Sequence, residues 1–165
     1  MSYYIIIRGP AASGKSTIAK KLAKKLHAHY INFDSVLSDH NLDIIEGDGI
    51  STENFIKGNN LIIGKIKERL VEGQIVIIDA CFYRKKHIEH LIKNLPYKHF
   101  IFSLKTSLEE CVRRNESREK KMTEKDIRDV FALVSRLEIG VPITTNGKTT
   151  HNVIKEIKSH IQHNH

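Results

Sequence analysis

Short aliphatic runs alternate with amphipathic stretches along the whole chain. The aliphatic runs predict strands, which we expect at residues 3–8, 29–34, 73–80, 99–106 and 141–147. Between them apolar residues recur three and four positions apart, which predicts helices from residue 15, over 52–71, 84–95 and 107–121, from residue 123, and over 152–161. Residues 38–51 interrupt the alternation: they are acidic and punctuated by glycine, and we expect them to be irregular.

Strands that alternate with helices are typical of an α/β fold, in which helices cover both faces of a parallel sheet. The chain has 165 residues, the size of one ordinary domain. We therefore expect residues 1–165 to form a single domain around a five-stranded parallel sheet. No apolar run reaches the length of a membrane span, and the N-terminus lacks the zones of a signal peptide. We expect no membrane contact and a cytoplasmic location.

The chain is basic, with 27 lysines and arginines against 19 aspartates and glutamates and a formal net charge of +8. This excess favours polyanionic ligands, a class that includes both ATP and nucleic acid, and it does not choose between them. Much of the excess lies on predicted helices, where basic side chains commonly form a solvated face. Cys81 and Cys111 lack metal-ligand spacing, and we expect both to be free thiols.

One short motif carries specific chemistry. Gly9, Gly14, Lys15 and Ser16 have the spacing G-x-x-x-x-G-K-S, directly between the first predicted strand and the first predicted helix. This is the pattern of a phosphate-binding loop, in which glycines let the backbone turn so that its amides point at an anion. The alternative is a glycine-rich turn that binds nothing. We expect a nucleotide to be bound by Gly9, Ala11, Ala12, Ser13, Gly14, Lys15, Ser16 and Thr17.

Three side chains are expected to act on the phosphates and on a metal ion. Lys15 can reach the β- and γ-phosphates, and the Ser16 hydroxyl can ligate Mg²⁺. Asp79 follows four aliphatic residues, which is the form of a Walker B strand, and we expect it to hold Mg²⁺ opposite Ser16. The alternative for Asp79 is a strand-ending aspartate that starts a turn. The pattern therefore predicts ATP and Mg²⁺ as cofactors.

A family resemblance rests on four features in their order along the chain. They are the phosphate loop, an aspartate at the end of the second strand, an aspartate at the end of the third, and an R-N-x-x-R element after the fourth. Together they resemble the small P-loop kinases of the adenylate, shikimate and polynucleotide-kinase-like group, often labelled AAA-type ATP-binding proteins. The resemblance extends from about residue 3 to residue 157 and implies an ATP-dependent phosphotransferase. The N-K-x-D signature of GTPases is absent from the sequence.

The resemblance implies roles for Asp34, Arg114 and Arg118. Asp34 matches the general base, or the carboxylate that orients an acceptor hydroxyl, and the alternative is a helix cap. Arg114 and Arg118 belong to the R-N-x-x-R element and, four positions apart on a predicted helix, share a face. In the family this element marks a lid, here about residues 113–125, whose arginines contact the phosphates or adenine. The alternative is a solvated face on which nearby glutamates pair with the arginines.

The acceptor is expected to bind against residues of about 35–72, which occupy the place of the substrate cap in related kinases. Residues 35–60 contain no arginine, whereas a phosphate or carboxylate acceptor usually requires an arginine clamp. The basic stretch 84–86 lies after Asp79 and would suit the 5′ end of a nucleic acid. In the family a carboxylate at Asp79 can also contact the acceptor.

We therefore expect a kinase that transfers the γ-phosphate of ATP to a hydroxyl group. The acceptor would be a polynucleotide 5′-OH or a nucleoside-like or sugar-like metabolite, because a hydroxyl needs the proton acceptor that Asp34 offers. One alternative is a nucleotide kinase with a phosphate acceptor. Another is a nucleotide-binding regulatory module without kinase activity.

Overall fold

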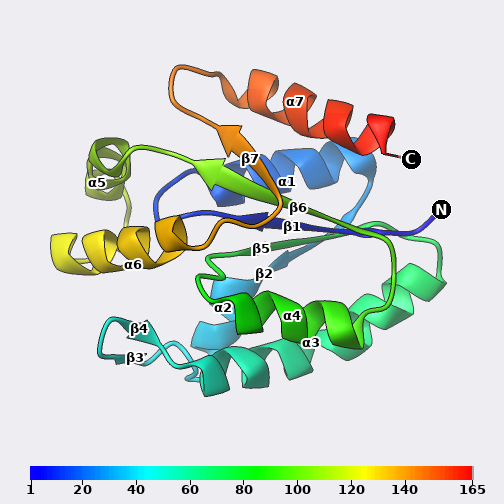
Figure 1. Ribbon diagram of the computed structural model, residues 1–165, viewed down its shortest axis with the longest axis horizontal. Helices are drawn as coiled ribbons and strands as arrows, with labels where there is room; N and C mark the ends of the chain where they lie inside the picture. The colour runs from blue at the N-terminus through cyan, green and yellow to red at the C-terminus, as the bar shows by residue number, and fades with distance from the viewer. Residues whose placement is uncertain (165) are drawn as a thin grey trace.

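The aliphatic runs form one parallel sheet in the computed structural model, which describes residues 1–164 (Figure 1). The strand order is β2-β5-β1-β6-β7, and every neighbouring pair is parallel. The prediction of a five-stranded parallel sheet is confirmed. Its strands are β1 (Tyr4–Arg8), β2 (His29–Asn32), β5 (Val76–Ala80), β6 (His99–Lys105) and β7 (Val141–Thr144).

The two central strands are continuous apolar runs because both of their faces are covered. Every residue of β1 and β5 is buried, as expected for strands with helices on each side. In their register Ile7 lies opposite Asp79 and Arg8 lies opposite Ala80. The phosphate loop that follows β1 and the acidic end of β5 therefore emerge side by side at the carboxyl edge of the sheet, where ligands of open α/β sheets collect.

Helices cover both faces of the sheet (Figure 1). On one face α1 and α7 bury Ile18, Leu22, Val153 and Ile157 against the strands. The other face carries α2, α3 and α4, and α5 and α6 lie toward the carboxyl edge. The helices are α1 (Lys15–Leu26), α2 (Phe33–Asp39), α3 (Thr52–Val71), α4 (Lys85–Asn94), α5 (Leu108–Glu116), α6 (Glu124–Arg136) and α7 (Thr150–His163).

The prediction of a second strand running through Asp34 is wrong. The strand β2 ends at Asn32, whose side chain accepts a hydrogen bond from the Ser35 backbone N–H at 3.2 Å and caps α2. Asp34 therefore lies in the first turn of a helix. The helix has seven residues, which is too short to produce the repeated apolar spacing by which longer helices are recognised.

The segment expected to be irregular also contains a small hairpin. Its strands are β3 (Ile45–Glu46) and β4 (Gly49–Ile50), and they pair antiparallel. The hairpin is held against the loop after β5, where the Tyr83 hydroxyl donates to the Ile50 carbonyl at 3.0 Å and accepts from the Ile50 N–H. A strand of two residues is too short to show an alternation of apolar and polar positions, so the sequence could not indicate this pairing.

Close packing of α2 on α3 depends on one glycine. A Cβ atom at Gly58 would lie 2.5 Å from Leu37 Cδ2 and 2.9 Å from Phe33 Cζ. Both neighbours belong to α2 and are buried. The absence of a side chain at Gly58 therefore lets α2, and Asp34 with it, lie close to the body of the domain.

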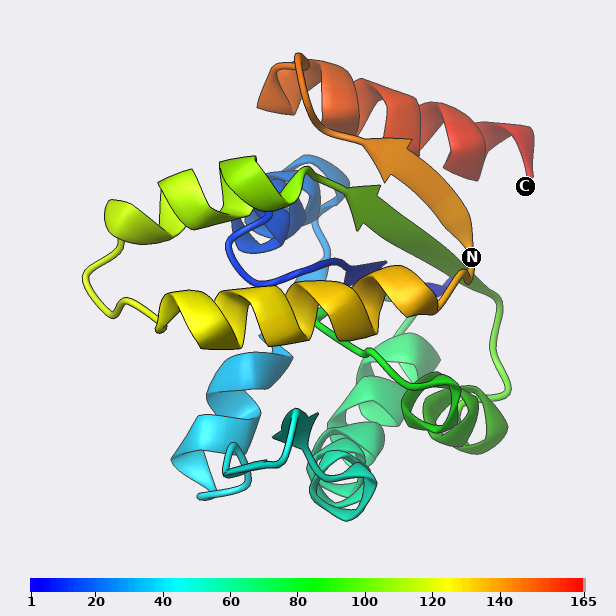
Figure 2. The ribbon, with the colours of Figure 1, turned by 60° about the vertical axis from the view of Figure 1, so that its left-hand side comes forward.

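The prediction that Arg114 and Arg118 share a helix face is wrong. The helix α5 ends at Glu116, and Arg118 lies in the connection to α6. The Asn115 side chain closes this connection, since its amide donates to the Met122 carbonyl at 2.8 Å and its oxygen accepts from the Met122 N–H at 3.0 Å. Figure 2 shows α5 and α6 lying beside one another, joined by this connection.

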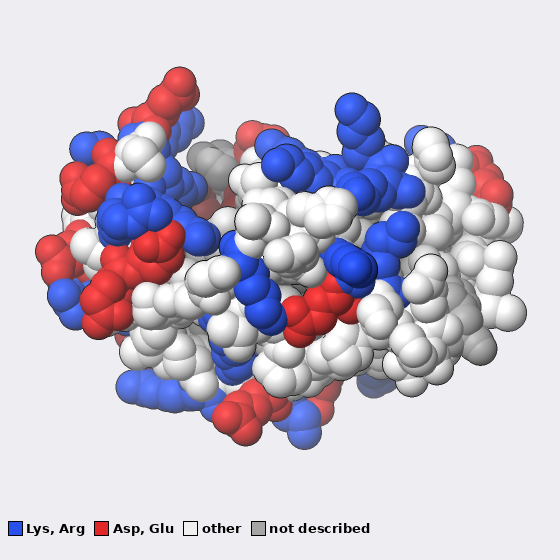
Figure 3. Space-filling model, turned by 90° about the horizontal axis from the view of Figure 1, so that it is seen from above, with Lys and Arg blue, Asp and Glu red and all other residues white. Residues whose placement is uncertain are grey.

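On the face that carries α7, basic side chains do not gather into one groove (Figure 3). Figure 3 looks down on the side of α7 and shows basic side chains over this face, mixed with acidic ones at the α5 end. Ion pairs there include Arg113 with Glu110 and Lys121 with Glu116. Among residues 1–164, none of the helices has the length and apolar character needed to cross a membrane.

Candidate active site

The phosphate loop presents its backbone to an anion. Ala12 (φ 61°) and Gly14 (φ 86°) adopt left-handed conformations, and the Ser13 N–H bonds the Pro10 carbonyl at 3.2 Å. Alternating conformations of this kind turn successive amides into a concave nest for anions. The helix α1 then begins at Lys15 with no side-chain cap and no acidic residue in its first turn. Its positive end therefore faces the loop uncompensated, as expected for a phosphate site.

Lys15 is buried beside the carboxylate of Asp34. Its side chain is 7% exposed, and its Nζ lies 3.6 Å from Asp34 Oδ2. Burial alone would lower the pKa of Lys15, but its neighbours, Cys81 first and then the carboxylates of Asp34 and Asp79, raise that pKa above its ordinary value. Burial raises the pKa of the Cys81 thiol to about 12, so near neutral pH the negative charge beside Lys15 comes from the two carboxylates. Lys15 therefore stays a cation.

Asp34 reaches this position from α2 rather than from a strand end. Its side chain is 49% exposed, so one edge of the carboxylate faces solvent while the other faces Lys15. The interpretation of Asp34 as a helix cap is wrong, because Asn32 is the N-cap of α2. The carboxylate is therefore available to a ligand that approaches from the open side.

Asp79 is held by a tyrosine that the sequence pattern did not single out. Asp79 is 1% exposed, and its Oδ2 accepts a hydrogen bond from the Tyr30 hydroxyl at 2.8 Å. Burial and the charge of Asp79 raise the pKa of Tyr30, so the phenol keeps its proton. A lone tyrosine in a short strand is ordinary strand composition, and only the fold brings it to the phosphate loop.

The residues around Asp79 fit a magnesium ion. Asp79 Oδ1 is buried and has no hydrogen-bond partner among the described residues. With the Ser16 hydroxyl it supplies oxygen ligands, directly or through water, which are the kind that Mg²⁺ prefers. Residues 1–164 contain no cluster of three or more histidine, cysteine or acidic side chains that could hold a metal alone. An ion here would therefore depend on phosphate oxygens and water, as Mg²⁺ in nucleotide sites usually does.

A cleft of about 530 Å³ opens over the phosphate loop. Its floor is the start of α1, α2 forms one wall, and the α5–α6 side forms the other. Arg118 lines this cleft and makes no ion pair within residues 1–164. The lining residues are Ala12, Gly14, Lys15, Ser16, Thr17, Asn32, Asp34, Ser35, Ser38, Arg114, Arg118 and Lys120.

Arg114 braces the phosphate loop from α5. Its Nη1 donates to the Ser13 carbonyl at 2.7 Å, and its Nε donates to Glu110 Oε1 at 2.7 Å. Hydrogen bonds from Arg113 and Arg114 lower the pKa of Glu110 to about 2. The alternative for Arg114, pairing with a nearby glutamate on a solvated face, is thus correct in the pairing with Glu110, but the side chain also bonds the phosphate loop.

A smaller pocket of about 200 Å³ adjoins the cleft beyond Arg114. It lies between the start of α1 and the loop from β7 to α7, which contributes Thr145 and Lys148. Two links fix this loop: Thr145 Oγ1 bonds Thr106 Oγ1 at 2.6 Å, and the Asn146 side chain bonds both Ser107 N and Ser107 Oγ at 3.0 Å. The sequence indicated none of these residues, because the loop carries no motif.

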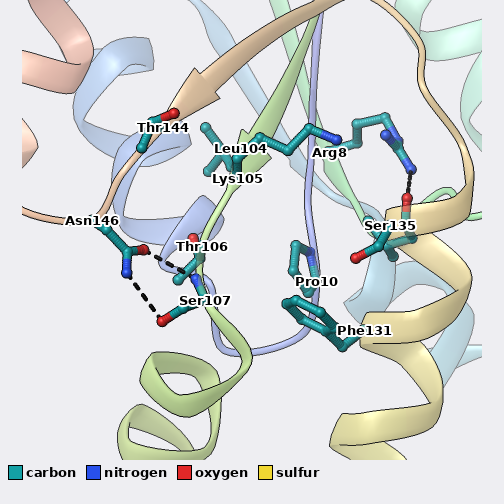
Figure 4. A pocket seen from close by; sticks show the side chains of 11 residues that line it. Arg8, Pro10, Leu104, Lys105, Thr106, Ser107, Phe131, Ser135, Thr144 and Asn146 are labelled. Carbon is teal, nitrogen blue, oxygen red and sulfur yellow. Dashed lines mark hydrogen bonds between the residues drawn. The ribbon is translucent and has the colours of Figure 1, made fainter.

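Figure 4 looks into another cavity, of about 330 Å³, lined partly by Ser107 and Asn146. The two dashed lines between these residues are the links that hold the β7–α7 loop. The side chain of Arg8 also borders this cavity and is fully buried. Its guanidinium donates to the carbonyls of Phe82, Val134 and Leu137 and to the Ser103 hydroxyl, and so ties β1 to the end of α6.

The basic stretch after Asp79 does not reach the site. Arg84 pairs with Asp48 at 3.4 Å and Lys85 pairs with Glu89 at 3.3 Å. Neither residue, nor Lys86, lines any of the cavities described above. The expectation that these side chains would suit the 5′ end of a nucleic acid therefore gains no support, because α4 begins directly after Arg84 and its first residues, Lys85 and Lys86, are exposed.

Comparisons with known proteins agree with this geometry. A family model described as an AAA domain matches residues 5–137. A Pyrococcus furiosus protein, provisionally named an adenylate kinase, is 26% identical over 157 residues, or 93% of this chain and 81% of that protein. A sugar kinase structure from Janibacter matches with a TM-score of 0.82 at 18% identity over 98% of this chain and 95% of that one. The APS kinase of Mycobacterium tuberculosis, solved with AMPPNP and APS, matches with a TM-score of 0.71 at 14% identity over 98% of both chains.

The family match covers most of the chain and begins in β1, so it includes the phosphate loop, Asp34, Asp79 and both lid arginines. The structural matches extend over nearly the whole length of both chains and establish the fold. The resemblance inferred from the order of motifs is thus confirmed. The chain belongs to the AAA domain family and has the fold of a small P-loop kinase.

Proposed function

We propose that this protein is a Mg²⁺- and ATP-dependent kinase that transfers the γ-phosphate to a hydroxyl group of a small molecule. One observation carries the proposal. Lys15, the cation of the phosphate loop, lies 3.6 Å from the carboxylate of Asp34. Both residues line the nucleotide cleft, and both also line a second cavity of about 310 Å³. A donor and an acceptor bound in the two cavities would meet at this pair.

The nucleotide would be bound mainly by backbone. The amides of residues 9–17 and the end of α1 surround the phosphates, and Lys15 contacts the β- and γ-phosphates. Ser16 and Asp79 would hold the Mg²⁺ ion, which neutralises charge on the phosphate oxygens when bound. The pocket beyond Arg114 would receive the adenine, with the planar guanidinium against its face.

Asp34 gives the site its preference for a hydroxyl. The acceptor oxygen forms a bond to the γ-phosphorus while the bond from that phosphorus to the β–γ bridging oxygen breaks, and ADP leaves with that electron pair. The hydroxyl proton passes to the Asp34 carboxylate, which the half-exposed position of the side chain permits. Phosphate acceptors are already ionised near neutral pH and need no such proton acceptor.

The two arginines would have different roles. Arg114 is committed to Ser13 and Glu110, so its contribution is to hold the loop and border the adenine pocket. Arg118 is free to turn inward and lines both cavities. With residues of about 113–125 acting as a lid, its guanidinium would stabilise the charge that spreads over the phosphoryl oxygens.

A nucleotide kinase with a phosphate acceptor is the second candidate, and the provisional adenylate kinase name of the Pyrococcus relative favours it. A polynucleotide acceptor has less support, because Arg84 and Lys85 are paired away from the site. A regulatory nucleotide-binding module would bind ATP without acceptor-stimulated turnover.

Release of ADP from ATP separates these functions. We expect little release by the protein alone and a clear increase with neutral hydroxyl compounds. Lys15→Ala should abolish both. Stimulation by nucleoside monophosphates alone would establish the second candidate, and tight ATP binding without any stimulation would establish the regulatory module.

A further inference from the structure

The second cavity adjoins the nucleotide cleft and has a different lining. Four residues line both spaces: Ala12, Lys15, Asp34 and Arg118. Beyond this shared border the cavity of about 310 Å³ extends between α2, the β3–β4 hairpin, the start of α3 and α6. The remaining lining residues are Ala11, Leu37, Asp43, Ile45, Gly49, Ile50, Phe55, Cys81, Tyr83, Met122 and Val130.

The walls of this cavity offer apolar surface. The partly open apolar residues of the lining are Ile45, Ile50 and Met122. Behind them Phe55 is 1% exposed and stacks on the buried ring of His87, with centroids 3.8 Å apart and planes within 8°, so the wall is held in place. Burial lowers the pKa of His87 to about 3, so its ring is neutral at physiological pH and the stack carries no charge. The Tyr83 hydroxyl already forms hydrogen bonds with the backbone N–H and the carbonyl of Ile50. What Tyr83 can present to a ligand is therefore mainly its ring.

The charges in the cavity disfavour an anionic ligand. Among residues 1–164, the cations that line it are Lys15 and Arg118, and both also line the nucleotide cleft. Its lining acids are Asp34 and Asp43. Arg84, the nearest basic residue in the sequence to this wall, pairs with Asp48 instead. A phosphate or carboxylate group on the acceptor would lie near the carboxylates of Asp34 and Asp43, without a further basic side chain in the described lining to pair with it.

From these three features we infer that the acceptor is a small alcohol that carries no anionic group and presents an apolar or ring-shaped face. The apolar face lies against Ile45, Ile50 and Met122, which are the partly open apolar residues of the lining, and the reacting hydroxyl points to Asp34 at the shared border. Phosphorylated and carboxylated compounds should be poor acceptors. The inference rests on the proposed kinase function and narrows its substrate class.

Matched pairs of acceptors test the inference in a single assay of ADP release at saturating ATP. Uridine is compared with uridine 5′-monophosphate, glucose with gluconate, and phenyl glucoside with glucose. We expect the uncharged member of each charge-matched pair to have a kcat/KM at least about tenfold higher, and phenyl glucoside to exceed glucose. A higher kcat/KM for the anionic members would overturn the inference and leave the kinase function standing. If no compound stimulates release while ATP still binds, both fail.

Reversing one charge in the cavity provides a second readout. Asp43 is exposed, so Asp43→Arg should fold normally, and it adds the cation that an anionic acceptor lacks. We expect the preference for the uncharged member to fall by about tenfold. Asp39→Arg is the matched control, because Asp39 is exposed on α2 and lines none of the three cavities. An equal change in both variants, or no change in Asp43→Arg, would contradict the assigned lining.

Discussion

The two halves of the site are built in opposite ways. The proposed nucleotide half is centred on one contiguous segment, residues 9–17, which follows a fully buried strand and runs into a helix, and the groups that would bind the phosphates are mainly its backbone amides. The acceptor half is assembled from α2, the β3–β4 hairpin, α3, the loop after β5 and α6, and its binding surface is made of side chains. A site for a common ligand is thus encoded locally, whereas the site for the specific ligand depends on tertiary packing.

We expect the largest effect from a substitution in the nucleotide half. Lys15→Ala removes the buried cation that faces the β- and γ-phosphates, and we expect transfer to fall by roughly 10³-fold. The measurement is single-turnover transfer, with nucleotide binding followed in parallel. Lys24→Ala is the control, since Lys24 is exposed on the same helix. Wild-type turnover in Lys15→Ala would rule out the phosphate-loop assignment.

Substitution of Arg118 shows whether its side chain contacts the bound ATP in the ground state or mainly in the transition state. We expect Arg118→Ala to slow transfer by about 10- to 100-fold while ATP affinity changes little, because lid contacts tighten when the site closes. Arg113→Ala should leave both quantities unchanged, since Arg113 is exposed and paired with Glu110. Equal losses of rate and ATP affinity in Arg118→Ala would mean that Arg118 binds only the ground state.

Tyr30→Phe tests how the metal position is held. Without its hydroxyl, Asp79 Oδ2 loses its hydrogen bond and the carboxylate is free to turn. We expect the Mg²⁺ concentration needed for half-maximal nucleotide binding to rise about tenfold, the size of effect seen for partners of metal ligands. Titration of Mg²⁺ into protein with a fluorescent ADP analogue measures this directly. An unchanged Mg²⁺ requirement would leave Tyr30 with a packing role alone.

The smallest expected effect concerns the packing beneath the acceptor half. Gly58→Ala places a Cβ 2.5 Å from Leu37 Cδ2, and we expect it to lower the free energy of unfolding by about 1–3 kcal/mol and to slow transfer by displacing α2. Gly64→Ala, in the same helix with open space around its Cβ, should instead raise stability by up to about 1 kcal/mol. Thermal unfolding of both variants checks the pair, and equal effects would contradict the assigned contact.

The same contrast explains which features could be predicted from the sequence. The phosphate-loop pattern, the five strands and the acid of β5 follow from local spacing and apolar runs. All five strands form, but three of them are clearly shorter than expected: β2, β5 and β7. The order of the motifs along the chain points to Asp34, but its helix has only seven residues and is too short to show a repeat of apolar positions. Tyr30, Phe55 and Tyr83 look like ordinary core residues in the sequence, since only the fold brings them to the site.

Asp34→Asn tests most directly whether a hydroxyl acceptor is activated at the junction of the two cavities. The substitution keeps the size of the side chain and removes the carboxylate that lies 3.6 Å from Lys15. General acid–base catalysis by a positioned side chain typically accelerates a reaction by about 10²- to 10⁴-fold. We predict a loss of the transfer rate in that range in single-turnover experiments. ATP affinity should barely change, because the loop amides and Lys15 remain. Transfer at a near wild-type rate would contradict the role of Asp34 and make a phosphate acceptor the better account.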